Sequence, residues 1–331
     1  MARMSTPSSP RPRGAPARRS AIARAVPLAL AAALGVAAAG CGAGDEAAAD
    51  AGRPVRAAAT VGMITDAVRA VGGDRVAVAG LMGPGVDPHL YKPTAGDVIA
   101  LGDADVIFYG GLHLEGRMVE LFEHIAAGGR PTVAVTADIP PDALRHPAAF
   151  AGAADPHVWF DVQLWQSAVR TIAAALADID PAGRAAYEAN RDAYLAELAA
   201  LDAWIVDEVA RVPRSQRVLI TAHDAFGYFG DRYGFEVLGI QGVSTAAEAG
   251  AADLRRLADL IAERRLKAIF VESSVPPATI EALEAAVASR GWQVDIGPPL
   301  FSDALGSPGT PAERYVGMVR HNVAAIVGAL R

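Results

Sequence analysis

The chain has 331 residues, of which 52% are apolar, so it can bury a sizeable core and is not disordered outside its ends. This length predicts two domains or one large one. The first forty residues carry six arginines and no acid, and the remainder holds 24 basic and 37 acidic residues, a net charge of −13. This charge excludes nucleic acid as a partner and is compatible with attracting cations.

The N-terminus has the order of a secretory signal peptide, which we assign to residues 1–40. A basic region is followed by an apolar stretch that ends in small residues before Cys41. The stretch is shorter than the about 20 residues that span a bilayer, so a retained anchor helix is the weaker alternative. Cys41, the only cysteine, resembles the acylated cysteine of a bacterial lipoprotein, although a free thiol left by chance is another interpretation. Residues 41–53 are small and acidic, which predicts a flexible tether.

The mature chain begins with alternating short apolar runs and amphipathic stretches. Strands are predicted at 55–61, 76–81, 106–109 and 132–135, and helices at 64–71, 95–101 and 117–126. Strands separated by helices predict a parallel sheet. We assign residues 54–180 to an N-terminal α/β lobe.

The same alternation restarts after about residue 214. Strands are predicted at 218–221, 236–238, 268–271 and 292–296, and helices at 225–233, 251–264, 279–289 and 312–330. Residues 214–331 therefore form a second α/β lobe in this interpretation. No repeat of fixed period is visible in the sequence.

The segment between the lobes, residues 181–213, predicts one long connecting helix. Asp180 and Pro181 are suited to its first turn, and Pro213 to its end. Apolar residues recur between them at helical spacing: Tyr187, Tyr194, Leu198, Leu201, Ile205 and Val209. We expect a rigid helix whose apolar stripe packs against both lobes.

Three histidines share one kind of position, at or just after a strand end or in a loop. They are His89, His157 and His223, and Asp303 has the same kind of location late in the second lobe. Ligands of parallel α/β sheets bind outside the carboxyl ends of the strands. We therefore expect two histidines of one lobe to face a histidine and an aspartate of the other across a cleft.

Such a set of nitrogen and oxygen ligands suits a first-row transition metal. Imidazole favours zinc and its neighbours, and a carboxylate adds negative charge and affinity for manganese. Cys41 is the only cysteine and lies at the predicted cleavage site, so we expect no sulfur ligand in the metal site. We assign the remaining histidines structural roles: His113, His124, His146 and His321.

Around these residues the chain resembles a known family, the zinc/manganese substrate-binding receptors of ABC importers, also called cluster A-I or TroA-like receptors. Six segments carry the resemblance in the right order, and it extends from Pro54 to the C-terminus. The segments are 87–94 (DPHLYKPT), 104–115 (ADVIFYGGLHLE), 155–159 (DPHVW), 221–229 (TAHDAFGYF), 272–275 (ESSV) and 302–306 (SDALG).

The resemblance implies two α/β lobes joined by a long helix, with Zn²⁺ or Mn²⁺ held between them by His89, His157, His223 and Asp303. Glu272 matches a position near the site, where we expect it to orient a ligand histidine. Zinc-dedicated members carry a long loop rich in histidine and acid before the second ligand. Here residues 136–154 contain only His146, which weakens an assignment to zinc alone.

The resemblance also implies a partner and a location. The partner is an ABC permease of the cytoplasmic membrane, and the receptor is a monomer held by its lipid anchor in the periplasm or on the outer face of the cell membrane. One alternative is a surface adhesin with a structural metal, which an exposed apolar patch would favour. The other is a zinc metallohydrolase, but the chain lacks an H-E-x-x-H motif and a fourth protein ligand would close the site to water, so we expect no enzyme.

Overall fold

The computed structural model describes residues 52–150, 152–247 and 250–331. The predicted signal peptide, Cys41 and most of the predicted tether lie outside the described residues. In the part of the chain that is described, no helix has the length and apolar character needed to cross a membrane.

The N-terminal lobe is built on a four-stranded parallel sheet with the strand order β2-β1-β3-β4. Its strands are β1 (Val55–Ala59), β2 (Val76–Gly80), β3 (Val106–Tyr109) and β4 (Thr132–Ala134). Its helices are α2 (Gly62–Gly72), α3 (Ala95–Asp103), α4 (Val119–Ala127) and α5 (Val162–Ile179), and the short η4 (Val158–Phe160) precedes α5. The parallel sheet and the first seven predicted elements are confirmed.

The C-terminal lobe repeats this topology, with four parallel strands in the order β6-β5-β7-β8. The strands are β5 (Val218–His223), β6 (Glu236–Gln241), β7 (Ala268–Glu272) and β8 (Asp295–Leu300). The helices are α7 (Gly227–Tyr233), α8 (Ala251–Arg264), α9 (Ala278–Ala288) and α10 (Tyr315–Leu330). In each sheet the first strand lies between the second and the third, so a repeat exists in the topology that the sequence does not reveal.

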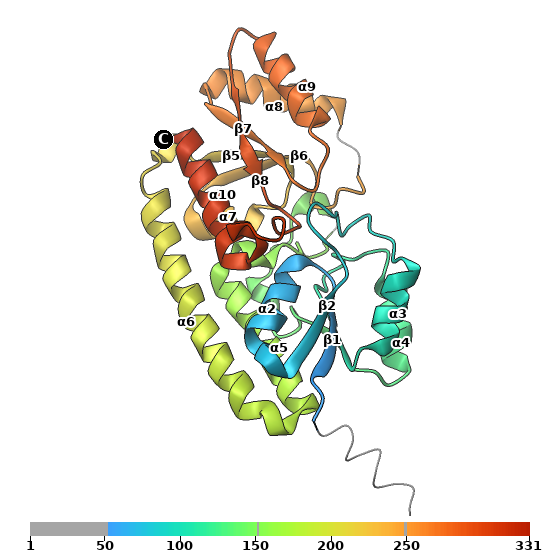
Figure 1. Ribbon diagram of the computed structural model, residues 1–331. Coiled ribbons are helices and arrows are strands. Elements are labelled where there is room, and N and C mark those ends of the chain that lie inside the picture. The colour runs from blue at the N-terminus through green and yellow to red at the C-terminus, as the bar shows by residue number, and fades with distance from the viewer. Residues whose placement is uncertain (1–51, 151, 248–249) are drawn as a thin grey trace, which may run out of the picture. The chain divides into compact units, whose positions relative to one another are not determined.

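The long helix α6 (Arg184–Val209) runs alongside both lobes (Figure 1). It contacts α2 and α5 of the N-terminal lobe, and α7 and α10 of the C-terminal lobe. All six apolar residues that predicted its stripe are buried: Tyr187, Tyr194, Leu198, Leu201, Ile205 and Val209. The helix is shorter than predicted at both ends, because residues 181–183 form a separate short turn, η5 (Pro181–Gly183), and α6 ends at Val209 rather than at 213.

The two lobes share one hydrophobic core. Residues from β5, α7 and α10 belong to the same buried cluster as the N-terminal sheet and helices, whereas a second cluster lies among β5 to β8, α8 and α9. At the junction the rings of Phe160 and Phe226 stack with their centroids 4.2 Å apart. The shared cluster, with the contact of Phe160 and Phe226, therefore holds the lobes together.

Three further elements are missing from the sequence analysis or displaced relative to it. Helix α5 was not predicted, although Asp161 caps it by accepting from the Gln163 and Leu164 amides. Strand β8 starts three residues later than predicted, and it contains two adjacent prolines. An edge strand tolerates a proline on its unpaired side, and the register shift between Phe270 and Glu272 in the pairing with β7 accommodates the other. Helix α10 starts at Tyr315 rather than at 312, because η7 (Pro311–Glu313) precedes it.

Candidate metal centre

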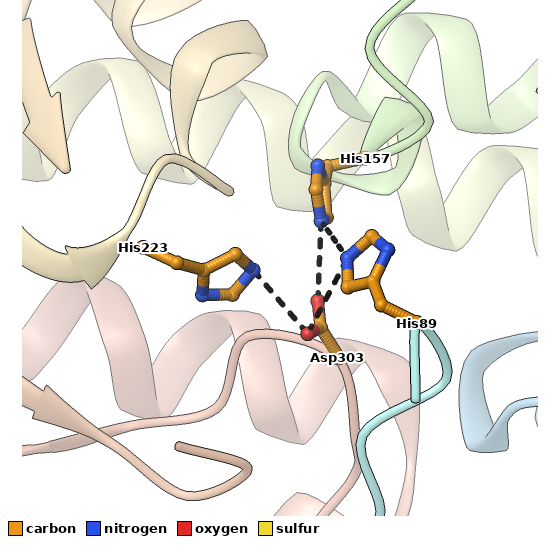
Figure 2. A group of neighbouring side chains, drawn as sticks. All are labelled: His89, His157, His223 and Asp303. Carbon is orange, nitrogen blue, oxygen red and sulfur yellow. Dashed lines mark hydrogen bonds and ion pairs between the residues drawn. The ribbon is translucent and has the colours of Figure 1, made fainter. Parts of the chain in front are cut away.

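The four residues singled out from the sequence come together in one cluster between the lobes (Figure 2). His89 lies in the loop between β2 and α3, and His157 directly precedes η4. His223 is the last residue of β5, and Asp303 follows β8. Three of the four thus follow the carboxyl end of a parallel strand, which is where such sheets place their ligands.

The potential ligand atoms of the cluster lie within 4.8 Å of one another. The Nε2 atoms of His89 and His157 are 3.3 Å apart. The Asp303 carboxylate lies 3.3 Å from Nε2 of both His157 and His223, and 3.9 Å from Nε2 of His89. Ligand atoms at about 2.1 Å around a tetrahedral metal would be about 3.4 Å apart, so most of these spacings match the edges of such a tetrahedron.

The cluster is closed to solvent, and several of its polar atoms lack hydrogen bonds. His157 and His223 are 0% exposed, Asp303 1% and His89 5%. Both carboxylate oxygens of Asp303 and Nε2 of His223 are buried with no hydrogen-bond partner among the described residues. Buried polar atoms are almost always hydrogen-bonded, so exceptions that converge on one point indicate a place for a cation.

Two further carboxylates hold two of the imidazoles. Asp155 accepts from the backbone amide of His157 at 3.0 Å and contacts its ring Nδ1 at 2.7 Å. Glu272 accepts from the amide of His223 at 2.8 Å and contacts Nδ1 of its ring. In both cases a carboxylate at Nδ1 leaves Nε2 directed at the cluster, an arrangement that orients metal-binding histidines.

His89 is held differently, although it also ends an Asp-Pro-His tripeptide, as His157 does. Asp87 accepts from the His89 amide at 2.9 Å, but its other oxygen accepts from the Thr245 hydroxyl at 2.6 Å. In the described chain no hydrogen bond reaches Nδ1 of His89. The ring of His89 is therefore positioned by its loop and not by a carboxylate of its own.

The charges of the cluster determine which groups are protonated. Burial lowers the pKa of His89 to about 3. Burial also disfavours a charged His157, but Asp155 and Asp303 outweigh it and raise the pKa of His157 to about 9. Burial is likewise outweighed for His223, whose pKa is well above its usual value because of Glu272 and Asp303, and for Asp303, whose pKa is held well below by His223 and His157. Without a metal, protonated histidines thus balance the buried aspartate.

The other four histidines lie outside this cluster. His113, His124, His146 and His321 are exposed, and the last two contact backbone carbonyl groups. Asp87 and Asp155 stand in the two Asp-Pro-His segments of the sequence, but no role was predicted for either. The repeated Asp-Pro-His tripeptide was the signal that could have identified both, whereas no sequence pattern indicated Thr245.

The fold and the cluster define a class: a two-lobed α/β binding protein with a closed metal-type site between the lobes. The family described as zinc-uptake complex component A, periplasmic, matches residues 58–329, and the chain belongs to this family. The zinc-binding protein TroA of Treponema pallidum is 50% identical over 285 residues, which cover 86% of this chain and 91% of TroA. The manganese-binding lipoprotein MntA of Bacillus subtilis is 44% identical over 292 residues, which cover 88% of this chain and 94% of MntA. The structure of the periplasmic zinc-binding protein TroA superposes with a TM-score of 0.81 at 49% identity, covering 84% of this chain and 99% of TroA.

The protonation of the cluster predicts that a metal must displace protons. His157, with a pKa of about 9, is protonated at neutral pH and must lose its proton to bind a metal, and the pKa of His223 is also raised well above its usual value. Metal affinity should therefore fall as the pH falls from 8 to 6, by about tenfold per pH unit for each proton that the metal displaces. Calorimetry in buffers of different ionisation enthalpy should detect at least about one proton released per metal at pH 7. A dissociation constant that is the same at both pH values would contradict this account.

Proposed function

We propose that this chain is the extracytoplasmic receptor of a metal ABC importer, which captures Zn²⁺ or Mn²⁺ and delivers it to a membrane permease. His89, His157, His223 and Asp303 are the proposed ligands, and Asp155 and Glu272 orient two of them. The observation that carries the proposal is the convergence of three imidazoles and one carboxylate in a closed site between two lobes. Family membership and the relatives that are named for zinc and manganese support it.

The alternatives find less support. An adhesin would be favoured by a broad apolar surface, but the large apolar residues that are exposed in the described part of the chain are few and none is aromatic: Leu90, Val98, Ile99 and Val206. A metallohydrolase needs an open coordination position and a base beside it. Here four side chains close the site, and the family supplies a binding component rather than an enzyme.

The proposal predicts that the metal stabilises the folded protein. A ligand that binds only the folded state at a hundredfold excess over its Kd adds about 2.7 kcal/mol. Zinc or manganese should therefore raise Tm by about 5 °C, and magnesium should do little because it prefers an octahedral oxygen shell. His157→Ala should abolish the shift, whereas His124→Ala, at an exposed position of α4, should retain it. If no transition metal changed the melting curve of the wild-type protein, the proposed function would be wrong.

The ligand at position 223 is expected to decide selectivity between zinc and manganese. Three neutral nitrogens and one carboxylate suit tetrahedral zinc, and manganese is lowest in the divalent affinity series. A glutamate at position 223 would add a charged oxygen, but it would also face Glu272. The test is a competitive titration of both metals. It compares a double variant that carries His223→Glu and Glu272→Gln with a single variant that carries Glu272→Gln alone. The zinc-to-manganese affinity ratio should fall roughly tenfold in the double variant. An unchanged ratio would mean that residue 223 is not a ligand.

We further propose that Cys41 is acylated and holds a monomeric receptor on a membrane. One acyl chain anchors only marginally, so more than one is expected. Cys41→Ser should release the mature protein into the soluble fraction on cell fractionation, with metal binding unchanged. A variant that stays in the membrane fraction would rule out the lipid anchor.

A further inference from the structure

The ligands on the His157 side are joined across the lobes by buried contacts. The Trp159 indole nitrogen donates to the Ser302 carbonyl at 3.1 Å, which ties the His157 segment to the residue before Asp303. The Tyr315 hydroxyl donates to the Trp159 carbonyl at 2.6 Å, and the Tyr228 hydroxyl to the Asp155 carbonyl at 2.9 Å. These bonds lie within the shared core, so this side of the site resists separation of the lobes.

The His89 side is joined far more weakly. His89 lies on the loop of residues 83–94, in which 83–85 are exposed. Outside the four-residue cluster, the described residues contain one hydrogen bond from this loop to the C-terminal lobe, from the Thr245 hydroxyl to Asp87. Thr245 is only half-buried, and His89 is the most exposed of the four clustered residues. The route between the site and solvent that needs the least disruption therefore passes His89.

We propose that Thr245 is a positioning residue for His89, and that its hydrogen bond to Asp87 acts as a latch that must open when the metal leaves. The inference rests on the proposed function of the same site. Asp87 connects the two ends of the latch, because one carboxylate oxygen accepts from the His89 amide and the other from Thr245. When the latch opens, His89 moves with its loop while the other three residues stay joined.

In this arrangement, different residues determine how tightly the metal is bound and how fast it is released. His157 and His223 are each oriented by a carboxylate in their own lobe, so they remain directed at the site when the loop that carries His89 moves. The carboxylate beside His89 is instead used in the contact between the lobes. Removing the Thr245 hydroxyl should therefore speed metal dissociation without slowing association.

The test is Thr245→Val, which keeps the shape of the side chain and removes the donor. Zinc is the probe, and its dissociation is started by an excess of chelator and followed by tryptophan fluorescence, since the Trp159 ring lies 5.2 Å from the His157 ring. A hydrogen bond to a charged group corresponds to a rate increase of about ten- to a hundredfold when it is lost. Thr245→Ser retains a hydroxyl and should stay within about threefold of the wild type. If the valine variant is unstable, Thr245→Ala is measured in its place.

Thr171→Val is the matched control, because the Thr171 hydroxyl donates to Asp138 at 2.8 Å within the N-terminal lobe. Its dissociation rate should equal that of the wild type. Equal dissociation rates for Thr245→Val and the wild type would overturn the latch, as would a variant that only associates more slowly. A wild-type protein that binds no zinc or manganese would instead overturn the proposed function, and the latch with it.

Discussion

The rest of the structure depends on one interaction, the contact of the buried Asp303 carboxylate with three imidazoles. An ionised carboxylate removed from water costs several kcal/mol unless positive charge compensates it. Here the compensation comes from His223 and His157, which lie 80 and 146 positions away in the chain, so the fold must bring distant segments to one point. Protonated histidines balance the charge in the metal-free protein, and a divalent cation can replace their protons.

The two sheets explain how four distant segments meet. Both have the first strand between the second and the third, so the loops after their strands are equivalent in the two lobes. His89 follows β2, His223 ends β5 and Asp303 follows β8. Helix α6 and the shared core then keep the lobes in a fixed relation on one side of the site. The site is thus a product of the topology, and the histidines need no proximity in sequence.

Much of this could be predicted from the sequence, because strand ends and capped helices are local features. The positions of the four clustered residues relative to strands and loops were correct, and so was the buried stripe of α6. Strand β8 was misplaced because Pro298 and Pro299 indicate a break, and only the sheet order shows that they lie on an edge. The contact of Asp87 with Thr245 joins residues 158 positions apart, and no local pattern encodes such a pair.

The two Asp-Pro-His tripeptides show how one local motif can serve two purposes. In both, the aspartate accepts from the histidine amide, which sets the same turn of the backbone. Asp155 then uses the same oxygen to hold the ring of His157, whereas the second oxygen of Asp87 reaches the other lobe. A closed site of four ligands would release its metal very slowly if all four were held alike, because differences in affinity arise mostly in the dissociation rate. In the mechanism that we propose, a single ligand held through a contact between the lobes lets the movement of one loop control release, while the other three preserve the site.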